Sequence, residues 1–383
     1  MLRASSDPAP ADTGPPADDD LVVRRVREHL ADHLAARARA AGAVAPPFAA
    51  TVVDWLVRFT VDGGKRTRPL FAWWGWRAAG GAAHGPAATA ALRAASALEL
   101  IQSCALVHDD VMDGSALRRG RPAAHAAFAA EHRAGAWSGD ARRYGEALAV
   151  LVGDLALVWA DDLLDEALDA LDAALGEPSA RVRVREPWRA MRTEMVAGQF
   201  LDLAAQARGE EAESAALRVA VLKTAAYSVE RPLHFGAALA GADPARVEAL
   251  RGYGRDIGTA FQLRDDLLGV YGDPARTGKP VGDDLREGKR TLLLAAGLRR
   301  ARERGDAAAL DTLRSAVGDR GLTAADLAAV RVVLDGLGAR DAVEAHVDRL
   351  VRRGVRRLGA VRIDAAARDA LARLAHRAAE RDQ

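Results

Sequence analysis

Several features that favour other classes of protein are scarce in this chain of 383 residues. It has a single cysteine, Cys104, so no disulfide can form within the chain. Aromatic residues make up only 5% of the sequence, and the apolar–polar alternation typical of β-strands is rare. The 54 basic and 53 acidic residues nearly cancel, which argues against binding to nucleic acid or to an anionic membrane surface.

Long hydrophobic segments are also missing. The longest candidate, residues 147–160, is interrupted by Asp154, so we expect no stable insertion into a membrane. Residues 1–20 are rich in Pro, Asp and Ala and lack the apolar core of a signal peptide, and we expect them to be a disordered tail. These features favour a soluble, cytoplasmic protein.

What the sequence does contain is a surplus of Ala, Leu, Arg and Glu, which are strong helix formers. Helical periodicity is nearly continuous from Leu21 onward, and no break is long and polar enough for a domain linker. We therefore predict an all-α protein with one domain over residues 21–383. The expected breaks lie near residues 42–47, 62–64, 80–86, 114–122, 135–139, 176–187, 241–244 and 272–288.

The sequence His108-Asp109-Asp110-Val111-Met112-Asp113 is the first candidate site. Asp109 and Asp113 are four residues apart, so on a helix they share one face. Two carboxylates on one face repel each other unless a cation lies between them. Mg²⁺ favours one or two carboxylates together with water and phosphate oxygens, so this pattern indicates a platform for Mg²⁺ and a diphosphate.

The same spacing also occurs at Asp161, Asp162 and Asp165, which shows that the pattern alone is weak evidence. This second copy has no basic residues just downstream, and we predict that it is a solvent-exposed helix face. The copy at Asp109, in contrast, is followed by the basic loop Arg118-Arg119-Gly120-Arg121-Pro122. Arginines that bind phosphate next to carboxylates that bind metal suit a diphosphate ligand.

Further clusters of both charges occur along the chain. Residues 63–69, GGKRTRP, form a basic turn that lacks the spacing of a nucleotide P-loop. A second acidic pair, Asp265-Asp266, is followed by Lys279, Asp283-Asp284 and Lys289. Two acidic clusters and several basic ones indicate ligands with much negative charge and several Mg²⁺ ions.

The sequence resembles the trans-isoprenyl diphosphate synthases, also called polyprenyl synthetases, and among them the geranylgeranyl diphosphate synthases. The resemblance runs from about Leu21 to beyond Leu292 and rests on motifs in one order: GGKRTRP, Gln102 with HDDVMD and RRG, GQFLD, KTAAYS, FQLRDDLLG and GKPVGDDLREGKRT. It implies long antiparallel helices around a deep apolar cavity. It also implies the condensation of isopentenyl diphosphate with an allylic diphosphate through an allylic cation.

Matching positions imply a metal site on two helices. Asp109 and Asp113 would bind Mg²⁺ on the allylic diphosphate, with support from Asp110. Asp265 would bind a further Mg²⁺ from the opposite helix, three ions in all, with Asp266 and Asp283 in the outer coordination shell.

Matching positions also imply the substrate contacts. Those to the allylic diphosphate are Arg118, Lys223, Lys279 and Lys289. Those to isopentenyl diphosphate are Lys65, Arg68, Gln102 and Arg119. Thr224 and Gln262 would lie beside the cationic carbon. A homodimer is implied by the resemblance alone.

One position departs from the family pattern. Many members complete the second acidic motif with a fifth-position Asp, and this chain has Gly269 there. Asp273 and Asp283 are the nearby carboxylates that we expect to compensate.

Product length in this family depends on side chains below the first acidic motif. Cys104 and Ala105, about 6–7.5 Å down the helix axis from Asp109, are both small. Ile101, about 12 Å down, is a partial floor. We therefore predict geranylgeranyl diphosphate as the product, with farnesyl or longer polyprenyl diphosphates as alternatives.

Two other classes of function remain open. A class I terpene cyclase shares the first acidic motif, but the second motif and the small number of aromatic residues do not fit a cyclase. An inactive partner subunit of an active synthase is suggested only by Gly269.

Overall fold

The computed structural model of the chain describes residues 19–273 and 281–380. Within these ranges the elements are helical apart from two strands of two residues each, which confirms the all-α prediction. Helix α1 (Asp19–Val44) begins two residues before the predicted domain boundary, and residues 1–18 lie outside the described residues. The division into a tail and one domain stays a prediction.

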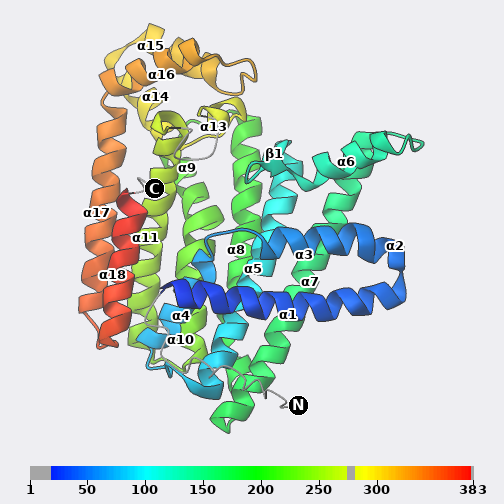
Figure 1. Cartoon of the computed structure of the whole chain (residues 1–383). Helices are drawn as coiled ribbons and strands as arrows, with labels where there is room; N and C mark the ends of the chain where they lie inside the picture. Colours follow the sequence, from blue (N-terminus) through cyan, green and yellow to red (C-terminus); the bar gives the residue numbers. More distant parts are fainter. Residues whose placement is uncertain (1–18, 274–280, 381–383) are drawn as a thin grey trace, which may run out of the picture.

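Long helices lie side by side and form the body of the molecule (Figure 1). They are α5 (Gly85–Asp113), α7 (Ala141–Leu175), α8 (Ala180–Arg208), α11 (Pro244–Tyr271), α17 (Ala339–Gly359) and α18 (Ala365–Glu380). Helix α5 packs most extensively against α7, and α11 packs against both α17 and the π-helical segment η2 (Ala220–Glu230).

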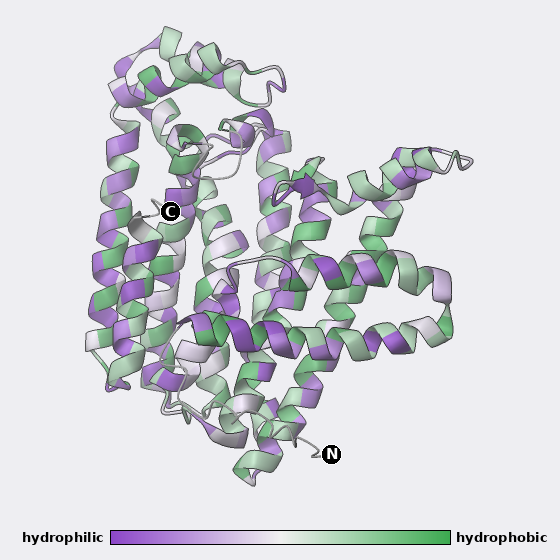
Figure 2. Cartoon of the chain, viewed as in Figure 1, coloured by the Kyte–Doolittle hydropathy of each residue, from purple (hydrophilic) through white to green (hydrophobic). Residues whose placement is uncertain are grey.

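The outer helices are amphipathic. On α17 the buried residues Val343, Val347, Leu350, Val351 and Leu358 recur at the spacing of one helix face. Hydrophilic and hydrophobic bands accordingly alternate along α17 in Figure 2. The buried face lies against α11, so burial of this apolar stripe holds the C-terminal helices on the bundle.

Two helices of the bundle, α4 (Thr67–Ala78) and α10 (Arg231–Leu239), are buried on nearly all sides. Helix α4 contains Trp73 and Trp74, each only 1% exposed, and it packs against α10, whose residues are all buried. When a helix is covered on nearly every side, close packing fixes the position of its ends. The basic turn that precedes α4 is therefore attached to a helix whose residues are largely buried in the core.

The remaining helices, of which α1 is long and the others are shorter, cover the sides and one end of the bundle. α1 and α3 (Asp54–Val61) lie across it in Figure 1, joined by α2 (Pro46–Phe48) and η1 (Ala49–Val53). The remaining elements are α6 (Ala124–Ala134), α9 (Glu213–Val219), α13 (Asp283–Arg286), α14 (Leu292–Arg304), α15 (Ala307–Ala316) and α16 (Ala324–Gly336).

Most predicted breaks fall between helices, but the short helix α13 (Asp283–Arg286) lies inside the predicted break at 272–288, and the breaks after α8 and between the C-terminal helices α14 to α18 were not predicted. Two more predicted breaks differ from the structure. The break at 176–187 is shorter than predicted, because α8 begins at Ala180 and takes in Pro187, which is buried. A proline inside a helix removes one backbone hydrogen bond, but α8 continues through Pro187, whose ring is buried. The break at 114–122 contains a hairpin of β1 (Leu117–Arg118) and β2 (Arg121–Pro122), which the all-α prediction did not include.

Helix α5 is long and apolar enough to cross a membrane by length and composition, although it contains no uninterrupted apolar run of 18 residues. Its apolar window is 78% buried inside the protein, as in the core helix of a soluble protein. The neighbours α4 and α7 cover it. We therefore assign α5 to the core.

Candidate active site

The first acidic motif lies at the C-terminal end of α5. The helix ends after Asp113 because Gly114 adopts a left-handed conformation, with φ of 66°. The C-terminal end of a helix carries partial negative charge, so the carboxylates of Asp109, Asp110 and Asp113 are unfavourable there unless cations accompany them.

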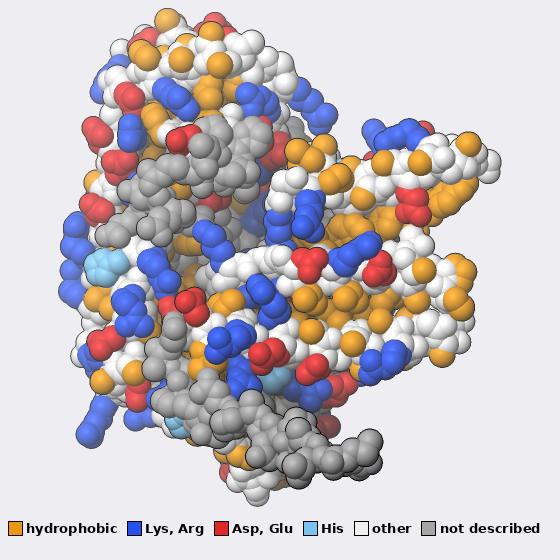
Figure 3. Space-filling view, in the orientation of Figure 1, with side chains coloured by type: hydrophobic (Ala, Val, Ile, Leu, Met, Phe, Trp, Pro, Cys, Tyr) orange, Lys and Arg blue, Asp and Glu red, His pale blue; other side chains and the backbone are white. Residues whose placement is uncertain are grey.

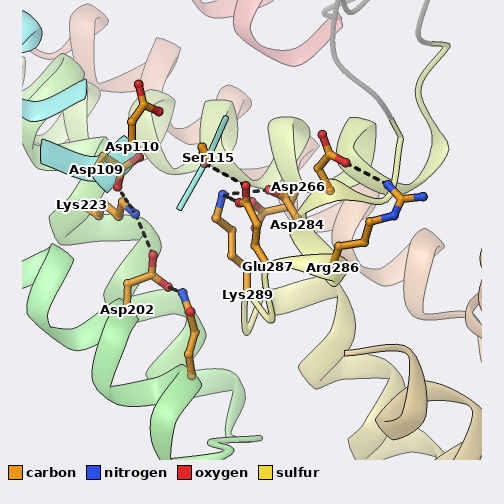
Figure 4. Close-up of polar contacts among 12 residues, drawn as sticks. Asp109, Asp110, Ser115, Asp202, Lys223, Asp266, Asp284, Arg286, Glu287 and Lys289 are labelled. Carbon is orange, nitrogen blue, oxygen red and sulfur yellow. Dashed lines mark hydrogen bonds and ion pairs between the residues drawn. The ribbon is translucent and has the colours of Figure 1, made fainter. Parts of the chain in front are cut away.

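Two basic side chains supply part of the positive charge that these carboxylates need. Lys223 Nζ lies 3.1 Å from Asp109 Oδ1 (Figure 4). Arg118 lies 3.5 Å from Asp109 Oδ2. Arg118 Nε also donates to Asp110 Oδ1 at 2.8 Å. Asp110, with a side chain only 2% exposed, is thus held by Arg118 rather than directed at a ligand.

Asp113 has no such partner. Both of its carboxylate oxygens are buried, and neither forms a hydrogen bond with the described part of the chain. Burial, with repulsion from Asp109 next, raises the pKa of Asp113 to about 6. A buried, unpartnered carboxylate one turn from another is a donor set that fits Mg²⁺.

Among residues 19–273 and 281–380, no three His, Cys, Asp or Glu side chains already form a metal-binding group. A Mg²⁺ ion bound by Asp109 and Asp113 would therefore take its other ligands from water or phosphate, as Mg²⁺ commonly does.

Lys223 is positioned by a residue that the sequence analysis did not assign. Asp202, in the GQFLD motif of α8, accepts a hydrogen bond from Lys223 Nζ at 2.7 Å. Although burial favours neutral lysine, Asp109 and Asp202 raise the pKa of Lys223. The two segments approach closely because Gly198 has no side chain; a Cβ there would lie 2.4 Å from the backbone nitrogen of Lys223. Thr224 follows on η2 and is half-buried.

The second acidic motif lies in the last turns of α11. Gln262 Nε2 donates to Asp266 Oδ1 at 2.7 Å, and burial, with the charge of Asp284 next, raises the pKa of Asp266. Asp265 is half-buried. The predicted Lys279 lies outside the described residues.

Asp284 lies directly beside Gly269. A Cβ on Gly269 would be 2.5 Å from Asp284 Oδ2, so the carboxylate of Asp284 occupies the space next to the fifth motif position. Asp283 instead pairs with Arg286 at 2.8 Å. The two adjacent residues point apart because successive helical side chains differ by about 100°.

The segments that follow the two acidic motifs contact each other and so connect the motifs (Figure 4). Ser115, just beyond α5, donates to Glu287 at 3.0 Å, and Lys289 pairs with Glu287 at 2.7 Å and with Asp284 at 3.1 Å. The charges of both Lys223 and Lys289 act on Asp113. Asp113 thus lies where the two halves of the site meet.

The two basic turns also come together. In the β1–β2 hairpin, Arg119 and Gly120 both have positive φ, as a tight two-residue turn requires. Arg119 NH1 donates to Phe59 O at 3.1 Å, and a Cβ on Gly63 would lie 2.3 Å from this same NH1 atom. The Arg119 side chain therefore reaches across the GGKRTRP turn. Basic side chains gather in this region of Figure 3.

Arg68 and Gln102 both contact the same residue, Tyr227. The guanidinium of Arg68 donates to Ser228 Oγ at 2.7 Å and lies 4.3 Å from the ring centroid of Tyr227. The hydroxyl of Tyr227 donates to Gln102 at 2.9 Å. Lys65, in the turn before α4, is exposed. The structure thus places the four residues predicted for isopentenyl diphosphate around the turn, α5 and η2.

Below Asp109 a partly exposed stripe continues down α5 through Ala105 to Gln102, whereas Ile101 is fully buried. Cys104 is 3% exposed, and burial raises the pKa of its thiol to about 12, which excludes a nucleophilic role near neutral pH.

A family model for polyprenyl synthetases matches residues 51–328. The chain belongs to the polyprenyl synthetase family. This synthase is 32% identical to a short chain isoprenyl diphosphate synthase of Methanothermobacter thermautotrophicus, over 84% of this chain and 87% of that one. It is 35% identical to the (2E,6E)-farnesyl diphosphate synthase of Mycobacterium tuberculosis, over 76% of this chain and 72% of that one.

The synthase is also similar to a solved structure, the geranylgeranyl pyrophosphate synthase of Corynebacterium glutamicum complexed with isoprenyl diphosphate and magnesium. The TM-score is 0.88 at 42% identity, over 95% of this chain and 99% of that one. These findings confirm the predicted family and all-α fold, and they make the synthase a chain-elongating prenyltransferase of a family that uses Mg²⁺.

Proposed function

We propose that the synthase condenses isopentenyl diphosphate with an allylic diphosphate and makes geranylgeranyl diphosphate. The observation that carries the C20 product is the face of α5 below Asp109. Ala105 is small and partly exposed, and Ile101 is buried about 12 Å below Asp109. A small side chain at Ala105 leaves room for elongation past farnesyl, and burial of each added carbon favours it by about 0.8 kcal/mol.

The proposed mechanism is ionisation followed by condensation. Lys223 and Arg118, which neutralise Asp109 and Asp110 in the free protein, would turn to the allylic diphosphate and stabilise the charge that grows on it. Mg²⁺, when bound, supplies Lewis-acid stabilisation of the same leaving group.

The double bond of isopentenyl diphosphate then attacks the allylic carbon, and the departing diphosphate takes the proton that is lost. Thr224 and Gln262 would line the cation, where the chain must hold the substrates in line and exclude water.

Three Mg²⁺ ions remain our proposal for the complex with diphosphate. Asp109 and Asp113 would bind two of them, and Asp265 the third. The position of Asp284 beside Gly269 supports a role for Asp284 in the outer coordination shell that we expected of Asp283. Lys279 and Lys289 complete the proposed set of diphosphate ligands.

A homodimer is also proposed, and an apolar surface supports it. Large apolar side chains are exposed at helical spacing on α7 and on the neighbouring α8: Val150, Leu151 and Val158 at 44–58%, Val196 and Phe200 at 62%. Clustered exposed apolar residues are typical of an interface. Phe200→Glu should shift the protein to monomers in light scattering, and a wild-type monomer would refute the proposal.

A product assay tests the function. Purified protein is incubated with isopentenyl diphosphate, Mg²⁺ and, separately, dimethylallyl, geranyl or farnesyl diphosphate, and the dephosphorylated alcohols are sized. We expect a C20 alcohol. A C15 or a longer alcohol would keep the reaction and refute the assignment of the floor to Ile101. The absence of condensation with every primer would favour an inactive partner subunit.

A further inference from the structure

A buried ion pair lies beneath the two basic turns and has no role in the mechanism above. Arg66 NH1 donates to Glu99 Oε2 at 2.6 Å, and the two side chains are 1% and 4% exposed. Arg66 lies between Lys65 and Arg68 in the GGKRTRP turn. Glu99 lies on α5 one turn before Gln102. The pair is thus adjacent in the chain to three of the residues proposed to bind isopentenyl diphosphate.

Arg66 ties three segments together. Besides Glu99, its guanidinium donates to the carbonyl oxygens of Thr60 at 2.6 Å and Val61 at 2.9 Å, at the end of α3. The backbone of Arg66 is left-handed, with φ of 52°, which is unfavourable for a residue with a side chain. Such a conformation persists only where surrounding contacts enforce it. Here those contacts are the ion pair and the two carbonyls.

A hydroxyl pair reinforces the same junction. Thr60 Oγ1 lies 2.9 Å from Ser103 Oγ, and Ser103 donates to the carbonyl oxygen of Glu99 at 3.0 Å. α3 and α5 are therefore joined by buried hydrogen bonds directly beside the ion pair.

Glu99 also faces the second basic turn. A Cβ on Gly64 would lie 3.5 Å from Glu99 Oε2 and 3.0 Å from Arg119 NH2, so these two groups flank the same glycine. The negative charge of Glu99 offsets the repulsion between the guanidinium groups of Arg66 and Arg119. Arg66 itself is buried and its two terminal NH groups are engaged with Glu99, Thr60 and Val61, so it does not face a ligand.

We propose that Glu99 and Arg66 are positioning residues that shape the isopentenyl diphosphate subsite by fixing the turn from which Lys65 and Arg68 extend. This inference rests on the proposed function of those two residues. The pair should act mainly on isopentenyl diphosphate, because it holds the turn that carries Lys65 and Arg68, whereas the basic residues proposed for the allylic diphosphate lie elsewhere, Lys223 on η2 and Arg118 on the hairpin.

Steady-state kinetics of Glu99→Gln separate this role from a merely structural one. We expect the KM for isopentenyl diphosphate to rise by at least about tenfold, the scale seen when a group supporting a ligand is lost. The KM for the allylic diphosphate should stay within about twofold. The matched control is Glu230→Gln, because Glu230 is equally buried, at 4%, and pairs with Arg251 at 3.0 Å and Arg255 at 2.8 Å.

Arg66→Lys is a milder second variant, because lysine keeps the charge beside Glu99 but cannot reach both carbonyls. It should raise the same KM by about threefold or more. Circular dichroism verifies the fold of each variant. If Glu99→Gln raises both KM values alike, or behaves like Glu230→Gln, the proposal is overturned; if Glu99→Gln does not fold, Arg66→Lys decides by the same criterion.

Calorimetric titration with isopentenyl diphosphate alone separates this inference from the proposed function. A wild-type protein that binds isopentenyl diphosphate but does not elongate a primer would refute the proposed reaction. The inference then holds if Glu99→Gln weakens binding about tenfold more than Glu230→Gln does, and fails if both bind equally.

Discussion

Two copies of one acidic pattern lie on helices that pack against each other, Asp109–Asp113 on α5 and Asp161–Asp165 on α7. In the α7 copy each carboxylate already has a partner. Asp161 accepts from Trp188 at 2.7 Å and pairs with Arg192 at 2.9 Å. Asp162 pairs with Arg37 at 3.4 Å, and Asp165 pairs with Arg181. These three acidic side chains are 39–63% exposed, as predicted for a solvent-exposed face.

The α5 copy has the same spacing and the opposite surroundings. Asp110 is buried against Arg118, and Asp109 shares Lys223 with Asp202. The carboxylate oxygens of Asp113 are buried without a hydrogen-bond donor in the described chain. The difference teaches that spacing brings carboxylates together, while the supply of arginines and the depth of burial decide whether a metal is still needed. Four substitutions test this contrast.

The largest expected effect is the loss of the α5 carboxylates. Asp109→Ala or Asp113→Asn should lower turnover on the order of a thousandfold, because transition-state charge on the diphosphate loses its stabilisation. Asp161→Ala and Asp165→Ala are matched controls on α7 and should stay within about twofold, since exposed ion pairs contribute little. Product formation measures all four. Equal losses on both helices would contradict the contrast.

A smaller loss of turnover is expected for substitutions at Gly269 in the second acidic motif and at Asp284 in the segment packed against it. Gly269→Asp should lower turnover about tenfold or more, because the new side chain collides with the carboxylate of Asp284. Asp284→Asn should also lower turnover, whereas Asp283→Asn, which only breaks the pair with Arg286, should have a smaller effect. Higher activity in Gly269→Asp would show that the missing carboxylate was a defect.

Substitutions on the face of α5 below Asp109 should change the chain length of the product more than the rate of the reaction. Ala105→Phe narrows the space below Asp109 and should shift the product toward C15. Ile101→Ala should extend it beyond C20. Chromatography of the dephosphorylated alcohols measures both, and an unchanged product in both variants would place the floor on another helix.

The smallest effect on catalysis is expected at Cys104. Cys104→Ala should leave turnover within about twofold, because a buried cysteine behaves as a small apolar side chain. Because burial raises the pKa of the Cys104 thiol, alkylation by iodoacetamide at pH 8 should be much slower in the native protein than in the unfolded chain. Reactivity should rise as the pH approaches that pKa. Fast alkylation of the folded protein would contradict the burial.

The sequence was sufficient for the helices and for residues within continuous motifs. The positions of Asp109, Asp113 and Gln102 along one helix follow from helical spacing alone. The arginine pairs of the α7 copy were less visible, yet the absence of nearby downstream basic residues indicated the right contrast with the α5 copy.

Residues whose roles depend on contacts between elements were not predictable. Asp202 stood in a quoted motif, but only the approach of α8 to η2 shows that it holds Lys223. The choice between Asp283 and Asp284 depended on which side chain of a single helical turn faces α11. Glu99 resembled any acidic residue in an apolar helix until its partner, 33 residues away, was in view.

The fit of Asp284 against Gly269 restricts how this enzyme can change over time. If Gly269 alone changes to Asp, the new side chain collides with the carboxylate of Asp284. If Asp284 alone is lost, the second motif has one acidic group fewer. Residues in contact seldom contribute independently. The two positions therefore constrain each other's evolution: only a paired exchange moves the carboxylate from loop to helix without passing through an impaired intermediate.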